Sequence, residues 1–193
     1  MYLFFDTETT GLPLKYNAPV TDTANWPRMV QLAWLEDDGT SSSIRGSNCI
    51  IFPVGYVIPE DVSKIHGITQ ARALDEGIDL RVVLSSFAAA MRRASCLVAH
   101  NIDFDISVIG AEFMRLGMRD ECNAFLAASR VCTMKTSTAF CGLKAKNGRP
   151  KWPKLQELHQ HLFGEEFANA HDAAADIMAT AKCFYELRAR GVI

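Results

Sequence analysis

The chain opens with YLFFDTETTG (residues 2–11), an apolar run that leads directly into two carboxylates one residue apart. The run 2–5 is short and aromatic, which predicts a buried strand. Because side chains alternate across a strand, Asp6 and Glu8 point to one side and Thr7 to the other. Such close carboxylates repel each other unless a cation lies between them, and Mg²⁺ and Mn²⁺ take oxygen ligands of this kind. The plainer alternative is two solvated acids at a strand-to-turn junction, and the motif alone leaves both interpretations open.

Length and composition favour one globular domain over residues 1–193. The chain has 193 residues, of which 49% are hydrophobic and 22% charged. These values are ordinary for a globular protein with a full core. The formal net charge of -2 gives no overall basic field. Any attraction to nucleic acid must therefore be local or act through metal ions.

The six cysteines and the apolar runs indicate in which compartment the protein works. The cysteines are scattered and have no C-x-x-C spacing, so a zinc site is not expected. Several lie in apolar runs, which is typical of buried thiols in a reducing compartment. We see no N-terminal targeting segment and no run of ~20 apolar residues that would span a bilayer. We therefore expect a cytoplasmic protein that does not insert into membranes.

The order of expected elements indicates an α/β domain with a mixed sheet. Three strands come first, and strands then alternate with helices. The expected strands are 2–6, 29–36, 47–52, 96–99 and 128–133, and the expected helices are 59–65, 80–94, 106–116, 154–163 and 171–190. The segment 12–27 is expected to be a long loop, and long loops are often functional. The segment 142–154 carries five basic residues and no acid.

Asp105 follows an expected strand and opens a helix. Open α/β sheets place their sites beyond the carboxyl ends of strands, where helices begin. Asp105 is therefore expected to meet Asp6 and Glu8 if the first and fourth strands are neighbours. The alternative is that Asp105, or Asp103 beside it, is simply a helix N-cap.

Asp176 lies inside the last expected helix and should face the sheet. The three alanines before it leave little bulk, so this helix can come close to the carboxylates of the first strand. His171 is five residues away, which corresponds to ~140° around a helix, so it is expected at the helix entrance. The alternative is that Asp172 and Asp176 only complement the helix dipole.

Together these motifs resemble the DEDDh family of 3′–5′ exonucleases, which includes the epsilon subunit of DNA polymerase III and ribonuclease T. The resemblance rests on three motifs in the family's order: Asp6-x-Glu8 with Thr10-Gly11, His100-Asn101-x-x-Phe104-Asp105, and His171-x-x-x-x-Asp176. The segment IHGIT (residues 65–69) also resembles the epsilon type. The resemblance covers about residues 1–190.

The resemblance implies a ribonuclease H-like fold, in which a five-stranded mixed sheet is flanked by helices. It implies that Asp6, Glu8, Asp105 and Asp176 hold two divalent cations, Mg²⁺ or Mn²⁺. It also implies that His171 is the general base that activates water. The reaction would be hydrolysis of the terminal phosphodiester at a 3′ end, with release of a nucleoside 5′-monophosphate.

Substrate contacts are expected around the same motifs. The substrate contacts that the resemblance implies are Thr9, Thr10, Gly11, Leu12, Ile65, His66, Asn101 and Phe104. Leu12 and Ile65 would wedge against the terminal nucleotides, and Phe104 would either stack on a base or belong to the core. The basic segment 142–154 is either a landing for the upstream strand or a solvated loop. His66, His159 and His161 are most simply exposed histidines, with His66 kept as a weaker substrate candidate.

Single-stranded DNA is the expected substrate, in repair or replication proofreading, and a polymerase is a possible partner. The chain stops at Ile193 without the docking tail of the epsilon subunit, so docking through such a tail is not expected. Alternatives are an exonuclease that trims RNA ends, a nuclease acting inside strands, and a non-catalytic nucleic-acid-binding module. The last is disfavoured because all four acids and the histidine are present.

Overall fold

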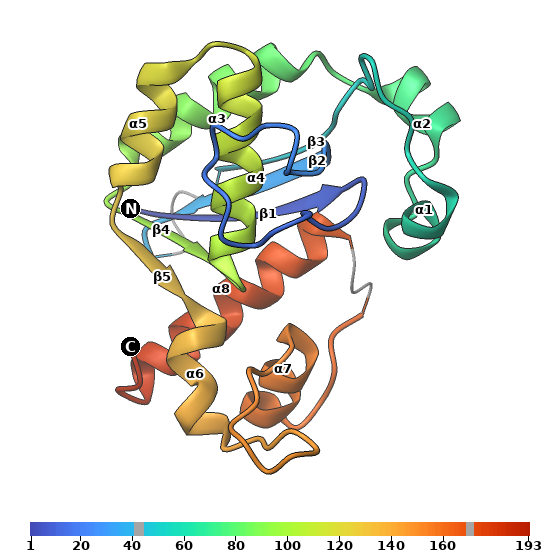
Figure 1. Ribbon diagram of the computed structural model, residues 1–193. Coiled ribbons are helices and arrows are strands. Elements are labelled where there is room, and N and C mark those ends of the chain that lie inside the picture. The colour runs from blue at the N-terminus through green and yellow to red at the C-terminus, as the bar shows by residue number, and fades with distance from the viewer. Residues whose placement is uncertain (41–44, 169–171) are drawn as a thin grey trace.

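Five strands form one mixed sheet in the order β3-β2-β1-β4-β5 (Figure 1). The computed structural model describes residues 1–40, 45–168 and 172–193. The strands are β1 (Tyr2–Thr9), β2 (Met29–Asp37), β3 (Arg45–Ile50), β4 (Cys96–Ala99) and β5 (Arg130–Cys132). β2 runs antiparallel to β1 and β3, whereas β1, β4 and β5 run parallel to one another. The predicted five-stranded mixed sheet, with a meander first, is confirmed.

The central strand β1 is longer than predicted, because β2 pairs with it over its whole length. The ladder runs from the pair Tyr2 and Asp37 to the pair Thr9 and Met29, with a register shift after Glu8. The predicted strand ended at residue 6. Asp6 and Glu8 therefore project from inside a paired strand rather than from a flexible junction, which fixes their direction.

Eight helices accompany the sheet in the described ranges. They are α1 (Glu60–His66), α2 (Gln70–Glu76), α3 (Leu80–Arg93), α4 (Ile102–Arg115), α5 (Arg119–Ala127), α6 (Thr133–Cys141), α7 (Leu155–Phe163) and α8 (Ala173–Ala189). The sequence had not predicted α2 and α5, which are short. α4 begins four residues earlier than predicted, because Asn101 takes a left-handed conformation (φ 65°) and turns the chain at once. None of these helices combines the length and apolar character needed to cross a membrane.

The two faces of the sheet carry different helices (Figure 1). Leu3 and Phe5 of β1 point into a core formed with α3, α4 and α5. Phe4 points the opposite way and packs against α8, where it meets Phe184 edge to face. α6 and α7 pack beside α8 through a smaller apolar cluster. This alternation puts Thr7 on the α4 face and the two neighbouring carboxylates on the α8 face.

The 12–27 loop is irregular, as predicted, but it is firmly attached to α4. Arg115 donates to the backbone carbonyls of Thr23 and Trp26. Glu112, which is 0% exposed, accepts from the Arg28 side chain and the Met29 backbone, and it also pairs with Arg115. A buried carboxylate with these partners ties the end of the loop to the helix behind the sheet.

Glu112→Ala should lower the free energy of unfolding, because it leaves Arg28 and Arg115 without their buried partner. Loss of one member of a buried ion pair costs about 3–5 kcal/mol of unfolding free energy. The control is Glu60→Ala, which removes an exposed pair with Lys64 and should cost less than about 1 kcal/mol. Urea unfolding of both variants measures the difference, and equal effects would contradict the anchoring role of Glu112.

Candidate active site

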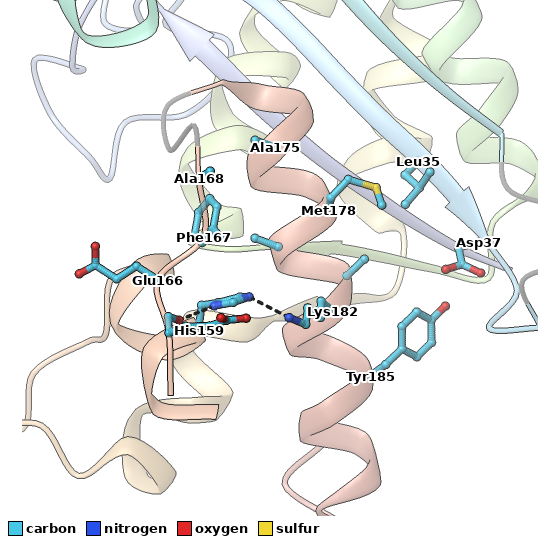
Figure 2. A pocket seen from close by; sticks show the side chains of 13 residues that line it. Leu35, Asp37, His159, Glu166, Phe167, Ala168, Ala175, Met178, Lys182 and Tyr185 are labelled. Atoms are coloured by element: carbon cyan, nitrogen blue, oxygen red, sulfur yellow. Dashed lines mark hydrogen bonds between the residues drawn. The ribbon is translucent and has the colours of Figure 1, made fainter. Parts of the chain in front are cut away.

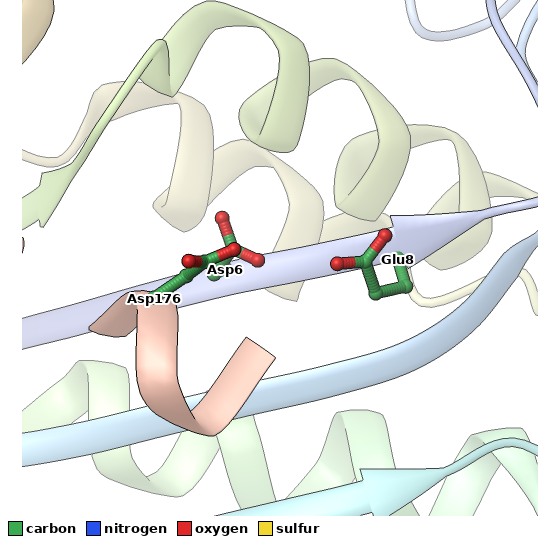
Figure 3. A group of neighbouring side chains, drawn as sticks. All are labelled: Asp6, Glu8 and Asp176. Carbon is green, nitrogen blue, oxygen red and sulfur yellow. The ribbon is translucent and has the colours of Figure 1, made fainter. Parts of the chain in front are cut away.

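Three carboxylates from two elements gather on the α8 face of the sheet. One oxygen from each of Asp6, Glu8 and Asp176 lies within 4.8 Å of the others (Figure 3). Asp6 and Glu8 come from β1, and Asp176 comes from the first turn of α8. We call these three residues the acidic cluster. Residues about 170 positions apart in the chain therefore lie close together, whereas the fourth predicted acid, Asp105, is not part of this group.

Small residues let α8 approach the strand this closely. Ala173 is completely buried in the cluster formed by Phe4, Ala33 and Val98. The helix starts at Asp172, whose side chain accepts from the backbone N–H groups of residues 174 and 175. Asp172 is thus the N-cap, and Asp176 is left to face the strand. The predicted general base, His171, lies outside the described residues.

Asp105 lies beside the acidic cluster and is held from the other face of the sheet. It is 3% exposed, and its Oδ1 accepts from the Thr7 backbone N–H at 3.1 Å and from the Thr7 hydroxyl at 2.7 Å. Asp105 belongs to the first turn of α4 and is not the N-cap, a position that Asn101 occupies. Its charge still raises the pKa of Asp6. Thr7 was not among the predicted site residues, although strand alternation directs it to the side opposite Asp6 and Glu8.

Burial and mutual repulsion make these carboxyl groups hard to ionise. Burial, followed by the charges of Asp105, Asp176 and Glu8, raises the pKa of Asp6 well above its ordinary value. Burial, followed by the charges of Asp176, Asp105 and Asp172, raises the pKa of Glu8 to about 8. Burial raises the pKa of Asp105 to about 7, although the hydrogen bonds from Thr7 oppose the change.

The donor set of the acidic cluster fits a hard metal cation. All its ligand atoms are carboxylate oxygens, which suit Mg²⁺, Mn²⁺ or Ca²⁺ rather than a soft ion. Two oxygens bound to one Mg²⁺ lie up to about 4.2 Å apart, close to the observed spacing. No ion pair among the described residues supplies a lysine or arginine to Asp6, Glu8 or Asp105. A bound cation would thus offset the burial and the mutual repulsion that raise the pKa values of these carboxyl groups.

Side-chain hydrogen bonds shape the turn at the end of β1. The Thr9 hydroxyl donates to the Gly11 carbonyl at 2.7 Å, and the Thr10 hydroxyl accepts from the Arg28 backbone N–H at 3.0 Å. Gly11 has φ 147°, a conformation that a side chain would disfavour. Leu12 is 73% exposed. In the described structure the two threonines shape the turn, while Leu12 remains available for contact.

Ile65 and His66 lie at the end of α1 and differ in exposure. Ile65 is 57% exposed, whereas His66 is buried, so the expectation of an exposed His66 was wrong. Its Nδ1 accepts from the Ile68 backbone N–H at 3.1 Å, and its Nε2 makes no hydrogen bond of ordinary geometry. Burial lowers the pKa of His66, and the nearby Thr9 carbonyl raises it by a smaller amount. His66 therefore supports the turn after β1 as a neutral ring.

Asn101 and Phe104 lie at the start of α4. Asn101 is exposed, and Phe104 is half-buried against the core on the α4 face while its ring also lines a surface cavity. Phe104 therefore belongs to the core in part, and its stacking on a base stays a prediction. The basic segment 142–154 has no regular helix or strand, and four of its five basic side chains are exposed. The fifth, Lys151, pairs with Glu157.

A cavity of about 660 Å³ opens beside α8, with His159, Met178 and Lys182 on its border (Figure 2). It lies between α7, α8 and β2, and none of its lining residues is one of the four acids. His159 borders it, with Nδ1 2.8 Å from the Glu165 carbonyl and Nε2 3.4 Å from Lys182 Nζ. His159 is only 3% exposed, so the expectation of an exposed histidine was wrong here too.

Comparison with known proteins gives an exonuclease family model and relatives of the same kind. Residues 3–184 match the family model described as Exonuclease (RNase_T). The DNA polymerase III subunit epsilon of Treponema pallidum (strain Nichols) is 34% identical over 108 residues, which are 56% of this chain and 44% of that protein. Three-prime repair exonuclease 1 of Homo sapiens is 24% identical over 193 residues, which cover 92% of this chain and 60% of that protein.

A solved structure shows the same fold. Exonuclease I of E. coli, in complex with a dT13 oligonucleotide, superposes with a TM-score of 0.74 at 22% identity, covering 98% of this chain and 41% of that chain. The expected ribonuclease H-like fold is therefore confirmed. The chain spans 44–60% of the length of the two curated relatives above.

Glu8→Gln should stabilise the metal-free protein at pH 8, because it removes a repelled charge. An ordinary glutamate has a pKa near 4.3, so between about pH 4 and pH 8 the folded protein holds a proton that the unfolded chain releases. The free energy of unfolding of the wild type therefore falls as pH rises through this window. Without metal, we expect a Tm gain of roughly 2–6 °C at pH 8 and little gain at pH 4.

Thermal unfolding in a chelator measures this effect, and Glu60→Gln, at an exposed position on α1, is the control. Added Mn²⁺ should raise the Tm of the wild type more than that of Glu8→Gln. The repulsion at Glu8 would be contradicted if, without metal, the Tm of the wild type and the Tm of Glu8→Gln rose by the same amount from pH 4 to pH 8.

Proposed function

The chain belongs to the exonuclease family whose model it matches over residues 3–184, and on that premise we propose that it is a 3′–5′ exonuclease. It hydrolyses the terminal phosphodiester of nucleic acid, with single-stranded DNA as the substrate, and releases nucleoside 5′-monophosphates. The observation that carries the proposal is the acidic cluster, in which Asp6, Glu8 and Asp176 converge within 4.8 Å.

Two divalent cations, Mg²⁺ or Mn²⁺, are the proposed cofactors, held by Asp6, Glu8, Asp105 and Asp176. When bound, they supply Lewis-acid activation of water and stabilisation of the leaving 3′ oxygen. The role of the chain itself is to hold four carboxylates in fixed directions. β1 and α8 hold three of them, and the two hydrogen bonds from Thr7 hold Asp105.

His171 is the proposed general base. Its assignment rests on the order of the family motifs, in which it directly precedes the N-cap Asp172 of α8. The neutral imidazole would accept a proton from the attacking water, a task for which histidine is the commonest choice at neutral pH.

Exposed apolar side chains beside the acids support action at strand ends. Leu12 and Ile65 are 73% and 57% exposed, and each flanks the turn after β1, where Thr9 and His66 meet. Both side chains are free of core packing, so their surfaces are open to contact with a substrate. We propose that they wedge against the terminal nucleotides, with Thr9, Thr10 and the Gly11 amide close to the 3′ end.

We further propose that residues 1–193 form a single exonuclease domain acting in DNA repair or replication, and a polymerase is a possible partner. The family match over almost the whole chain supports the domain proposal. The named relatives, a polymerase subunit and a repair exonuclease, support the setting.

Asp176→Asn should abolish the release of mononucleotides from a 3′-labelled single strand with Mg²⁺. Loss of a group that only supports a metal ligand costs ~10–100-fold, so loss of a ligand should cost more than ~100-fold. The control is Asp75→Asn, an exposed residue of α2. Retained stepwise release by Asp176→Asn would remove the metal assignment. RNA of the same sequence tests whether the enzyme prefers DNA. A circular single strand of DNA tests whether it needs a 3′ end.

His171→Gln should lower kcat by ~10²–10⁴-fold, the usual contribution of a general base. It should leave the Tm increase caused by Mn²⁺ unchanged, and it should remove the acidic limb of the pH–rate profile. The control is His161→Gln, an exposed histidine of α7. A large loss of strand binding at unchanged kcat would instead give His171 a positioning role.

A further inference from the structure

A cavity of about 420 Å³, which we call the aromatic pocket, opens next to the start of α4. Its lining includes Tyr16, Trp26, Asn101, Phe104, Lys135 and Trp152. Its size is in the range of small-ligand sites. Tyr16 and Trp152 are 65% and 61% exposed, and Phe52 is the only other aromatic ring among the described residues given as exposed, at 38%. Two of the three exposed aromatic side chains thus border one cavity.

The aromatic pocket lies at the same edge of the sheet as the acidic cluster. β1, β4 and β5 are parallel, and the segments that follow them supply the 12–27 loop, the start of α4 and the start of α6. Asn101 and Phe104 line the pocket within four residues of Asp105. A nucleic-acid strand whose 3′ end lies at the acidic cluster can therefore reach the aromatic pocket along the same edge of the sheet.

The loop side of the pocket is held by side-chain hydrogen bonds. Asn25, which is 5% exposed, bonds the Lys15 backbone in both directions, at 2.7 Å through its Oδ1 and at 2.9 Å through its Nδ2. Tyr16 follows directly. The indole N–H of Trp26 is occupied by the Pro19 carbonyl at 3.2 Å, so Trp26 offers only its ring to the pocket.

The opposite side is held by His100. Burial lowers the pKa of His100 to about 4, so its ring is neutral at physiological pH. The Pro153 carbonyl, 3.0 Å from Nε2, can only accept, so Nε2 carries the proton. Nδ1 then accepts from the Thr133 hydroxyl at 3.0 Å. This neutral histidine fixes the residue after Trp152 to the ends of β4 and β5.

Charge at the pocket mouth favours a nucleic acid over an apolar peptide. Lys135 pairs with Asp103 at the rim, so the rim is not left acidic. Trp152 itself lies in the basic segment, which has exposed Lys144, Lys146, Arg149 and Lys154. Aromatic rings that stack bases beside cations that attract phosphates are the combination found in single-strand-binding grooves.

We propose that the aromatic pocket binds an unpaired nucleobase of the substrate strand upstream of the terminal phosphodiester, a role that rests on the exonuclease activity proposed above. The base stacks between exposed rings, with Trp152 as the main platform. Only an unpaired base can enter, because a base inside a duplex has no free faces. The pocket thereby selects single-stranded ends.

The test is a fluorescence titration with short single strands in a chelator, so that no hydrolysis occurs. Trp26 and Trp34 are 3% and 5% exposed, so Trp152 is the tryptophan most open to quenching. We expect quenching by the strand, loss of most of that signal in Trp152→Phe, and about tenfold weaker binding by Trp152→Ala. Phe52→Ala is the control, an exposed ring outside the pocket, and should bind like the wild type.

Abasic substitutions then locate the base. Removing the base at one upstream position should weaken wild-type binding to the level of Trp152→Ala, and should not weaken Trp152→Ala further. Equal binding by Trp152→Ala, Phe52→Ala and the wild type would overturn the proposal. So would a Trp152→Ala defect that no abasic position cancels, since Trp152 would then contact only the backbone or serve folding.

The two proposals fail separately. Quenching and an abasic position that cancels the Trp152→Ala defect, without mononucleotide release in Mg²⁺, would support the pocket and reject the activity. Stepwise release with the same KM in Trp152→Ala and the wild type would support the activity and overturn the pocket.

Discussion

Repulsion among carboxylates is the constraint around which this fold is arranged. Asp6, Glu8 and Asp176 converge on the α8 face, and Asp105 adds its charge from the α4 face. Burial, together with neighbouring charges, raises the pKa of Asp6, Glu8 and Asp105, so holding these groups together in ionised form has an electrostatic cost. Such a cost persists only where a ligand of opposite charge compensates for it or where the surrounding structure enforces it.

The enforcing structure comes from ordinary packing on both sides of β1. Apolar side chains point alternately to the two faces of the strand, so Phe4 is fixed against α8 while Leu3 and Phe5 are fixed in the core with α3, α4 and α5. The carboxylates follow in the same strand and inherit these directions. Alanine at the start of α8 removes the bulk that would otherwise keep the helix, and with it Asp176, away from the strand.

The edge of the sheet beyond the parallel strands also carries the walls of the aromatic pocket. The 12–27 loop is bound to α4 through Arg115 and the buried Glu112, and His100 binds the segment that contains Trp152. These contacts turn two irregular segments into fixed walls on either side of the α4 start. Binding surfaces in loops depend on such anchoring, because a mobile loop loses conformational entropy when it binds.

The sequence by itself determined the sheet, the order of its strands in the chain, and the acids that meet. Strand alternation is a local property with a period of two, so Asp6 and Glu8 could be placed on one face from ten residues of sequence. The start of one helix and the early part of the last helix pointed Asp105 and Asp176 to the same site, and the family motifs then supported both. Helices α2 and α5 were missed because they are short and their patterns weak, and the burial of His66 and His159 was missed because a lone histidine carries no local signal.

Only the tertiary structure decided how Asp105 is held and where the aromatic pocket forms. The bonds from Thr7 to Asp105 join residues 98 positions apart, and the pocket joins Tyr16 to Trp152 across most of the chain. No local period links such residues. Their meeting depends on parallel strands that bring the segments after β1, β4 and β5 to one edge, which is a property of the assembled sheet.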